Sequence, residues 1–285
     1  MMMNDEIIDN ERQQERYTDE LRLDADRTPS RQNNNICNKN DEGQWTRVVN
    51  HRFTKELAAG TIDIENVLVP YLVQDHRFLD SFSILLASTI ASLPTLSQRI
   101  PLCQFLAVIT GPENTYFERA FDELGVSPAE RTQIPDADVT TKFCNLMREV
   151  AIGIPTSRSS SAAAGGGGDG GDYSQHPVNI CGSTLAEKLA VLVVCEWSYL
   201  SWGRLVQHQT VRERFVCYEW VDLHSGPEFE SIVDYLRKLL DEEGRRLKEE
   251  GNLEGLQACQ RRFLQTVNLE EEFFEYAYSH KHQPS

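Results

Sequence analysis

The stretch from Leu185 to Val206 is apolar on almost every side, and this property limits the folds that are open to the chain. A helix that is apolar all round is normally buried among other helices. One carboxylic acid, Glu196, stands in the middle of this stretch, directly after Cys195. A buried carboxylate costs several kcal/mol unless it is paired, protonated or used in chemistry. The stretch therefore predicts a central helix whose acid needs partners from elsewhere in the chain.

The remaining chain also indicates helices. Its β-branched residues follow the 3.6-residue period and not the alternation that is typical of strands. Apolar residues recur at helical spacing in eight further stretches: 44–60, 61–94, 100–111, 112–125, 139–154, 211–226, 227–251 and 253–280. Asp63 is the expected N-cap of the second stretch, Pro227 the expected first residue of the seventh, and Gly60 and Gly125 are expected helix ends. We therefore predict an all-α fold of roughly eight to ten helices.

Two parts of the chain do not fit a packed core. Residues 1–42 are polar and rich in Asn, Asp, Arg and Gln, which predicts a disordered tail. Residues 156–177 form a Gly- and Ser-rich insertion of low complexity, which predicts a flexible connection. This insertion is no phosphate-binding loop, since neither a preceding strand nor a Gly-Lys-Ser/Thr ending is present. We expect a single helical domain over residues 43–280.

The charge of the chain excludes some classes of partner. The formal net charge is −16, whereas binding to nucleic acid or to an anionic membrane needs a basic surface. No apolar run approaches the roughly 20 residues that span a bilayer, and the N-terminus lacks the apolar core of a signal peptide. The 7 cysteines are scattered and form no CxxC pair, which favours buried free thiols over disulfides or a structural metal site. A cytoplasmic protein without a metal is expected.

Five segments together resemble a known family. They are HRFTKELAAGTIDIENVLVPYL, VQDHRFLDSF, CEWSYLSWG, CYEWVDLHSGPEF and LEEEFFEYAY. In order and spacing they are similar to the TenA / thiaminase II family, and the likeness extends from about Trp45 to Tyr278. This resemblance implies a haem-oxygenase-like helical bundle that associates as a dimer or tetramer. It also implies hydrolysis of a small pyrimidine in thiamin salvage, without a cofactor.

The resemblance assigns roles to acidic residues and to one thiol. It implies that Asp75 grips an aminopyrimidine ring and that Glu270 contacts the same ring. Cys195 falls where one branch of the family has a nucleophilic cysteine. Glu196 falls where another branch, common in plants and other eukaryotes, has a glutamate, and the chain looks closer to this branch.

The chain also departs from the cysteine branch. Phe78, Phe143 and His224 stand where that branch has active-site tyrosines, and loss of their hydroxyls disfavours a cysteine mechanism. Aromatic side chains near the acids could still stack on a bound ring, namely Tyr71, Tyr199, Phe274 or Trp197.

The sequence leaves the catalytic group open between two neighbours. Glu196 in an apolar helix should have a raised pKa, which suits a group that gives and takes protons. Cys195 could act as a nucleophile only if a base or positive potential lowered its pKa. Adjacent side chains on a helix diverge by about 100°, so the two should not face one pocket equally. We favour Glu196, with Glu270 as a further candidate.

Three functions remain possible at this point. The first is a hydrolase of an aminopyrimidine or its N-formyl derivative. The second is a binding or regulatory protein that has lost catalysis, since tyrosines are missing. The third is a haem-binding relative, for which His51 is the candidate ligand in the first helical stretch, although a histidine bonded locally is the simpler interpretation.

Overall fold

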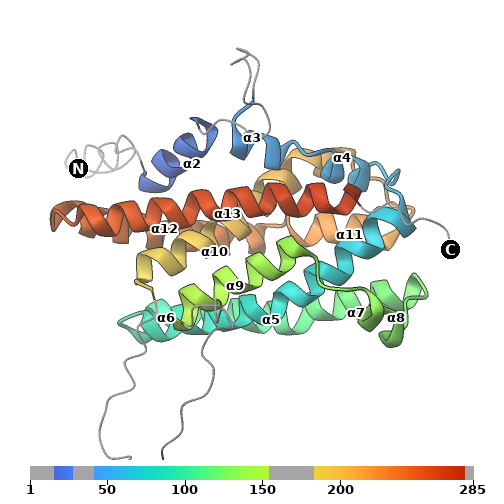
Figure 1. The fold of residues 1–285 in the computed structure, drawn as a ribbon, viewed down its shortest axis with the longest axis horizontal. Coiled ribbons are helices and arrows are strands. Elements are labelled where there is room, and N and C mark those ends of the chain that lie inside the picture. Colours follow the sequence, from blue (N-terminus) through green and yellow to red (C-terminus); the bar gives the residue numbers. More distant parts are fainter. Residues whose placement is uncertain (1–15, 28–41, 154–182, 280–285) are drawn as a thin grey trace, which may run out of the picture.

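The computed structural model describes residues 16–27, 42–153 and 183–279, and each regular element within these ranges is a helix (Figure 1). The prediction of an all-α fold is therefore confirmed for the described part of the chain. In chain order and with the labels of Figure 1, the elements are α2 (Tyr17–Arg27), α3 (Gln44–Val49), α4 (Arg52–Ala58), η1 (Ile64–Leu68), α5 (Val69–Ser92), α6 (Leu96–Val108), η2 (Ile109–Glu113), α7 (Asn114–Glu123), α8 (Pro128–Gln133), α9 (Asp138–Ile152), α10 (Leu185–Val206), η3 (Gln207–Gln209), α11 (Phe215–Leu223), α12 (Pro227–Glu249) and α13 (Leu253–Ser279).

Helix α10 is the central element of the bundle. It packs against α12 and α13 on one side, against α5 and α9 on another, and also contacts α3, α4 and α11. Between Leu189 and Cys195 every side chain is buried, as the apolar sequence predicts. Hydrophobic burial of this kind is the main favourable term in folding.

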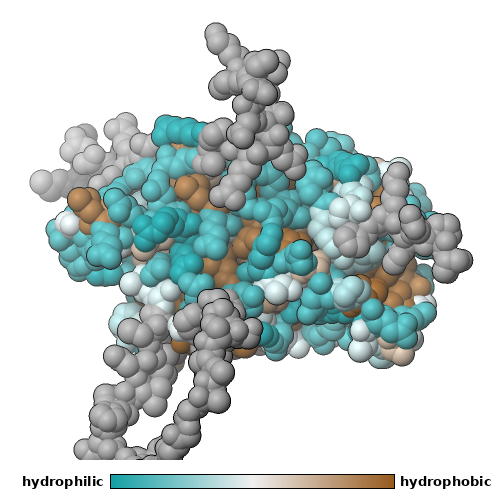
Figure 2. Space-filling view, in the orientation of Figure 1, coloured by the Kyte–Doolittle hydropathy of each residue, from teal (hydrophilic) through white to brown (hydrophobic). Residues whose placement is uncertain are grey.

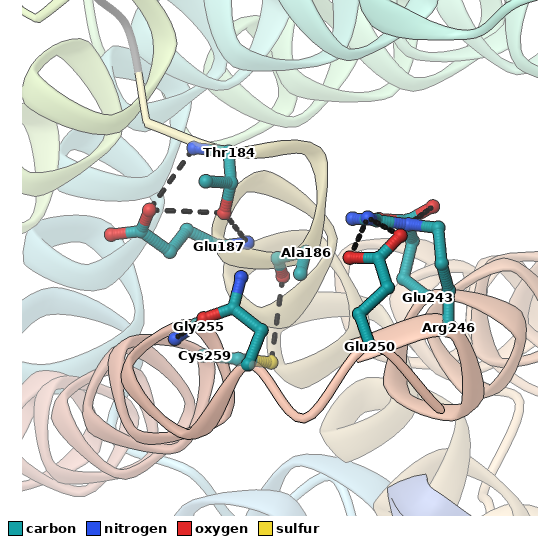
Figure 3. A network of polar contacts seen from close by, with 9 residues as sticks. Thr184, Ala186, Glu187, Glu243, Arg246, Glu250, Gly255 and Cys259 are labelled. Carbon is teal, nitrogen blue, oxygen red and sulfur yellow. Dashed lines mark hydrogen bonds and ion pairs between the residues drawn. The ribbon is translucent and has the colours of Figure 1, made fainter. Parts of the chain in front are cut away.

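Local contacts fix where α10 begins and how it meets α13. Thr184 and Glu187 form a reciprocal capping box, which satisfies free N–H groups at the helix start (Figure 3). On α13, the thiol of Cys259 points at the carbonyl oxygen of Ala186, with 3.6 Å between sulfur and oxygen (Figure 3). The first turn of α10 is thus attached to the helix that carries Glu270.

Helix α10 is long and apolar enough to cross a membrane, although the sequence predicted no such segment. By length and composition alone, Leu185–Gln209 could cross a bilayer. However, 72% of its apolar window is buried inside the bundle, and the core helix of a bundle passes the same test. The hydrophobicity is accounted for by packing.

The remaining helices form layers around this core. Figure 1 shows α2, α3 and α4 along one edge, α13 across the middle, and α5, α6 and α7 along the opposite edge. Helices α5 and α9 pack closely against each other. The outer surface in Figure 2 is largely hydrophilic with scattered apolar patches, in line with the acidic composition.

Helix α2 corrects the predicted domain boundary. The disorder predicted for residues 1–42 is wrong over Tyr17–Arg27, because this segment is a helix that buries Tyr17, Leu21 and Ala25. Its polar side bonds to the bundle through Asp19 to Arg237 and through Glu20 to Lys248. The other residues of the predicted tail, and the predicted insertion at 156–177, lie outside the described residues.

Other local differences have clear causes. The stretch predicted as one helix over 44–60 is two, because the imidazole of His51 accepts a hydrogen bond from Phe53 N and caps a new helix. The segment between the predicted helical stretches 112–125 and 139–154 contains a further helix, α8, which begins with a capping box between Ser127 and Glu130. All five described cysteines are free thiols, although Cys103 is exposed and not buried as expected.

Candidate active site

A cavity lies where α5, η2, α9, α10, α11 and α13 meet. The empty space within it, including the part that is open to solvent, amounts to about 480 Å³. Apolar and aromatic side chains form most of its wall, which is common for a small-molecule site. Its lining residues are Asp75, Phe78, Leu79, Phe82, Ile109, Glu113, Phe143, Cys195, Glu196, Tyr199, Trp220, His224, Glu270 and Phe273.

Four carboxyl groups share this cavity, and they differ in accessibility. Asp75 and Glu270 are deeply buried, with 7% and 2% of their surface exposed. Glu113 and Glu196 are only partly buried. Among the described lining residues there is neither a lysine nor an arginine. The cavity therefore offers no fixed cation to balance these acids.

Burial favours the protonated form of each of these acids. It raises the pKa of Asp75 to about 7, although a hydrogen bond from Tyr71 acts in the opposite direction and lowers this pKa. Burial, followed by the charge of Asp75, raises the pKa of Glu113 to about 8. Burial also raises the pKa of Glu196 and of Glu270 well above the ordinary carboxyl range, with the charges of Glu113 and Asp75, respectively, as the next largest causes. The cavity thus presents both proton donors and proton acceptors near neutral pH.

A hydrogen-bond relay orients Asp75. The hydroxyls of Tyr199 and Tyr71 are 2.7 Å apart, and Tyr71 also bonds to Asp75. Since Tyr71 donates to the carboxyl of Asp75, Tyr199 donates to the oxygen of Tyr71. The second oxygen of Asp75, Oδ2, is buried without a partner. A buried unpartnered acceptor costs free energy, so this oxygen is suited to an N–H group of a ligand.

Cys195 and Glu196 both line the cavity, although the sequence argument expected one of them to dominate. The cavity wall extends over enough of α10 to include two neighbouring side chains. Cys195 bonds to the carboxyl of Glu270. Burial, followed by the charges of Glu270 and Glu196, raises the pKa of the Cys195 thiol well above its usual value. The thiol is therefore protonated at neutral pH and is a poor nucleophile.

His224 forms one end of the cavity as a neutral side chain. Its Nδ1 donates to the carbonyl oxygen of Trp220 at 2.8 Å, which leaves Nε2 as an acceptor. Burial lowers the pKa of His224 to about 4. Gly203 on α10 permits this placement, because a Cβ there would lie 2.5 Å from the carbonyl oxygen of His224.

The structure brings most of the predicted site residues together. Eight of them line the cavity: Asp75, Phe78, Phe143, Cys195, Glu196, Tyr199, His224 and Glu270. Tyr71 and Phe274 are fully buried behind the wall and do not line it, and Phe273 takes the place expected of Phe274. Trp197 faces elsewhere, against the ring of Trp45 at 4.7 Å.

Sequence reasoning missed Glu113 and Trp220. Glu113 closes η2, a wide helical turn between α6 and α7 that includes Pro112. Such π turns are rare and often occur at functional sites. The only signal in the sequence was Gly111-Pro112 followed by an acid, which we interpreted as the start of a helix.

His51 is not part of this site. Its Nε2 lies 3.1 Å from Glu275 Oε1, and its Nδ1 caps α4. No observation on the described residues therefore favours the haem-binding interpretation. Within the same ranges, no group of three His, Cys, Asp or Glu side chains is arranged to hold a metal ion.

Comparison with known proteins gives consistent matches. A model of the TENA/THI-4/PQQC family matches residues 39–153. An aminopyrimidine aminohydrolase from Halalkalibacterium halodurans is 24% identical over 240 residues, which cover 83% of this chain and 91% of that protein.

Solved structures show the same fold. A TenA homologue from P. horikoshii OT3 superimposes with a TM-score of 0.65 at 18% identity, over 93% of this chain and 99% of that one. A TenA family transcription regulator from Silicibacter sp. TM1040 does so with a TM-score of 0.66 at 19% identity, over 92% and 96% of the two chains. These matches confirm the predicted haem-oxygenase-like helical bundle.

Proposed function

We propose that this chain, whose residues 39–153 match the TENA/THI-4/PQQC family, hydrolyses an aminopyrimidine formed from thiamin, with a glutamate as the catalytic acid. One observation carries this proposal: Glu196 lies in the same cavity as the buried carboxyls of Asp75 and Glu270, beside a thiol that is held protonated. The name of the relative from Halalkalibacterium halodurans supports the same substrate class.

The deep end of the cavity suits a pyrimidine that carries an amino group. The free Oδ2 of Asp75 can accept a hydrogen bond from the exocyclic amine, and a proton on the ring or the acid can join the ring nitrogen to the same carboxyl. Glu270 comes from another helix and can serve a second ring nitrogen. Phe78, Phe143 and Tyr199 supply aromatic surface for stacking.

Glu196 supplies the proton that the leaving nitrogen needs. In the reaction, water adds to the methylene carbon at ring position 5, the bond from that carbon to nitrogen breaks, and the amine leaves with an added proton. Because burial and the charge of Glu113 raise the pKa of Glu196, its carboxyl carries a proton at neutral pH. An acid in this state can give up that proton as the C–N bond breaks.

The test is a direct assay of the purified protein. It is incubated with 4-amino-5-aminomethyl-2-methylpyrimidine, with the N-formyl derivative and with thiamin, and release of hydroxymethylpyrimidine is followed. We expect turnover of at least one of the three. If a folded preparation turns over none of them, the protein is not this hydrolase.

A second candidate function is binding without catalysis. It is favoured by the loss of hydroxyl groups at Phe78, Phe143 and His224, all of which line the cavity. In that case the same pyrimidines would raise the melting temperature without being consumed. A cytoplasmic location and assembly into a dimer or tetramer stay predictions.

A further inference from the structure

The four carboxyls of the cavity divide into two pairs by what holds them. Asp75 accepts from Tyr71, and Glu270 accepts from Cys195. Glu113 and Glu196 have no hydrogen bond from another described residue. Asp75 and Glu270 are therefore held in place by hydrogen bonds within the protein, whereas the carboxyls of Glu113 and Glu196 are available to a reacting group.

The free pair is also the accessible pair. Glu113 and Glu196 keep partial exposure, whereas Asp75 and Glu270 are almost fully buried. Water enters a cavity from its accessible side, so a base that activates water should lie there. Glu113 reaches this position from η2, whose Ile109 and Glu113 both contribute to the wall.

We propose that Glu113 is the general base that accepts the proton of the attacking water, while Glu196 supplies the proton to the leaving nitrogen. This assignment rests on the function proposed above. It gives the protein a catalytic carboxylate on the connection between α6 and α7, outside the motifs that carry the family resemblance.

The step balances with these two groups alone. In molecules whose Glu113 is ionised, a fraction that grows as the pH rises through about 8, the oxygen of water forms a bond to the methylene carbon and transfers one proton to the Glu113 carboxylate. The C–N bond breaks, its electron pair stays on nitrogen, and the Glu196 proton moves to that nitrogen. Ammonia leaves, and a net proton transfer from Glu113 to Glu196 through solvent restores both groups.

The other titratable groups that face Glu113 are weaker candidates for this base. They come from α5, α10, α11 and α13, and they are Asp75, Cys195, Glu196, Tyr199, His224 and Glu270. His224 has a pKa of about 4 and is a weak base, whereas the pKa of Glu113 is about 8. A base is most effective when its pKa lies near the working pH. Asp75 and Glu270 are held by their donors, and Cys195 carries a proton.

The first test compares Glu113→Gln with Glu123→Gln. Glu123 is the last residue of the neighbouring helix α7 and is exposed, so it is a matched control. We expect Glu113→Gln to lower kcat for the aminopyrimidine by about 100-fold or more, with little change in KM, and to flatten the acidic limb of the kcat profile against pH. Glu123→Gln should behave as the wild type.

The second test replaces water by a nucleophile that needs no base. Hydroxylamine is neutral at pH 7.5 and attacks without prior loss of a proton. With Glu113→Ala we expect the hydroxylamine adduct of the pyrimidine, detected by mass spectrometry, at a rate well above that of water. With Glu196→Ala the adduct should not form, because the leaving nitrogen still lacks a proton.

The outcomes of these tests distinguish failure of the Glu113 assignment from failure of the proposed hydrolase function. If the wild type turns over the pyrimidine and Glu113→Gln keeps kcat within about twofold, Glu113 is not the base and the proposed function stands. If Glu113→Gln lowers kcat but Glu113→Ala forms no hydroxylamine adduct, Glu113 has a positioning role and its assignment as the base is wrong. If the wild type turns over no substrate, both proposals fail.

Discussion

Tyr71 acts on the site through Asp75, although it does not line the cavity. Its hydroxyl receives a hydrogen bond from Tyr199 and passes one to the carboxyl of Asp75. This hydrogen bond lowers the pKa of Asp75, whereas burial of the carboxyl raises it. Tyr71 therefore helps to keep Asp75 ionised near neutral pH.

We predict that Tyr71→Phe raises KM for the aminopyrimidine by roughly tenfold at pH 7 and that raising the pH reverses part of the effect. Without the donor the pKa of Asp75 rises further, so less of its carboxylate is present to bind the ring. Steady-state kinetics at pH 7 and 8.5 measure both effects.

Tyr116→Phe is the matched control, since Tyr116 is equally buried and donates at 2.7 Å to Val216 O outside the cavity. Equal KM values for the two variants at pH 7 would show that the relay does not tune Asp75.

Sequence motifs predicted which residues converge, but not which of two neighbours faces inward. Glu196 was found because a carboxyl within an apolar helical stretch is unusual, whereas Asp75 and Glu270 were found only through the family resemblance. The choice between Phe273 and Phe274 depends on the rotation of α13 about its axis, which neighbouring helices set. Glu113 was missed because a wide turn, not a helix start, aims it into the cavity.

At the scale of elements, close approach of α10 and the end of α11 shapes the cavity. Trp220 and His224 line it only because Gly203 lets the His224 backbone come within reach of α10. A side chain at this position would push that backbone away.

We predict that Gly203→Ala destabilises the protein by about 1–3 kcal/mol, because its Cβ would meet a backbone oxygen and not a flexible side chain. Chemical denaturation measures the loss. Gly111→Ala is the control, since a Cβ there has nothing within 4 Å and alanine favours helix more than glycine. Equal stabilities for the two variants would mean that α10 and α11 do not need this contact.

Helix α2 shows why a docked element can escape a sequence prediction. It is 11 residues long and polar in composition, and so short a helix is marginal on its own. Its stability comes from Tyr17, which packs against α12 where Gly244 leaves room. That docking is a tertiary contact between distant residues, which local spacing does not reveal.

For the whole molecule, the buried acids link stability to pH. Asp75 and Glu113 titrate near pH 7 and 8 in the folded protein, against about 4 in an unfolded chain. Between these values the folded state binds more protons than the unfolded state. Their contribution to stability is therefore complete below about pH 4 and is lost as the pH rises through 7 and 8.

We predict that the melting temperature of the ligand-free protein falls between pH 5.5 and 8.5, and that Glu113→Gln reduces the fall. The net charge of −16 acts in the same direction through general repulsion, so Glu123→Gln is needed as a control for removal of one surface acid. An equal fall for Glu113→Gln and the wild type would contradict the raised pKa of Glu113.

The central claim is that a glutamate and not a cysteine catalyses the reaction, and one measurement tests it most directly. It is the initial rate of hydroxymethylpyrimidine release by Glu196→Gln and by Cys195→Ala, each relative to the wild type. We predict that Glu196→Gln loses activity by about 100-fold or more, while Cys195→Ala keeps most of it. The reverse result, loss with Cys195→Ala and retention with Glu196→Gln, would contradict the account and assign the chemistry to the thiol.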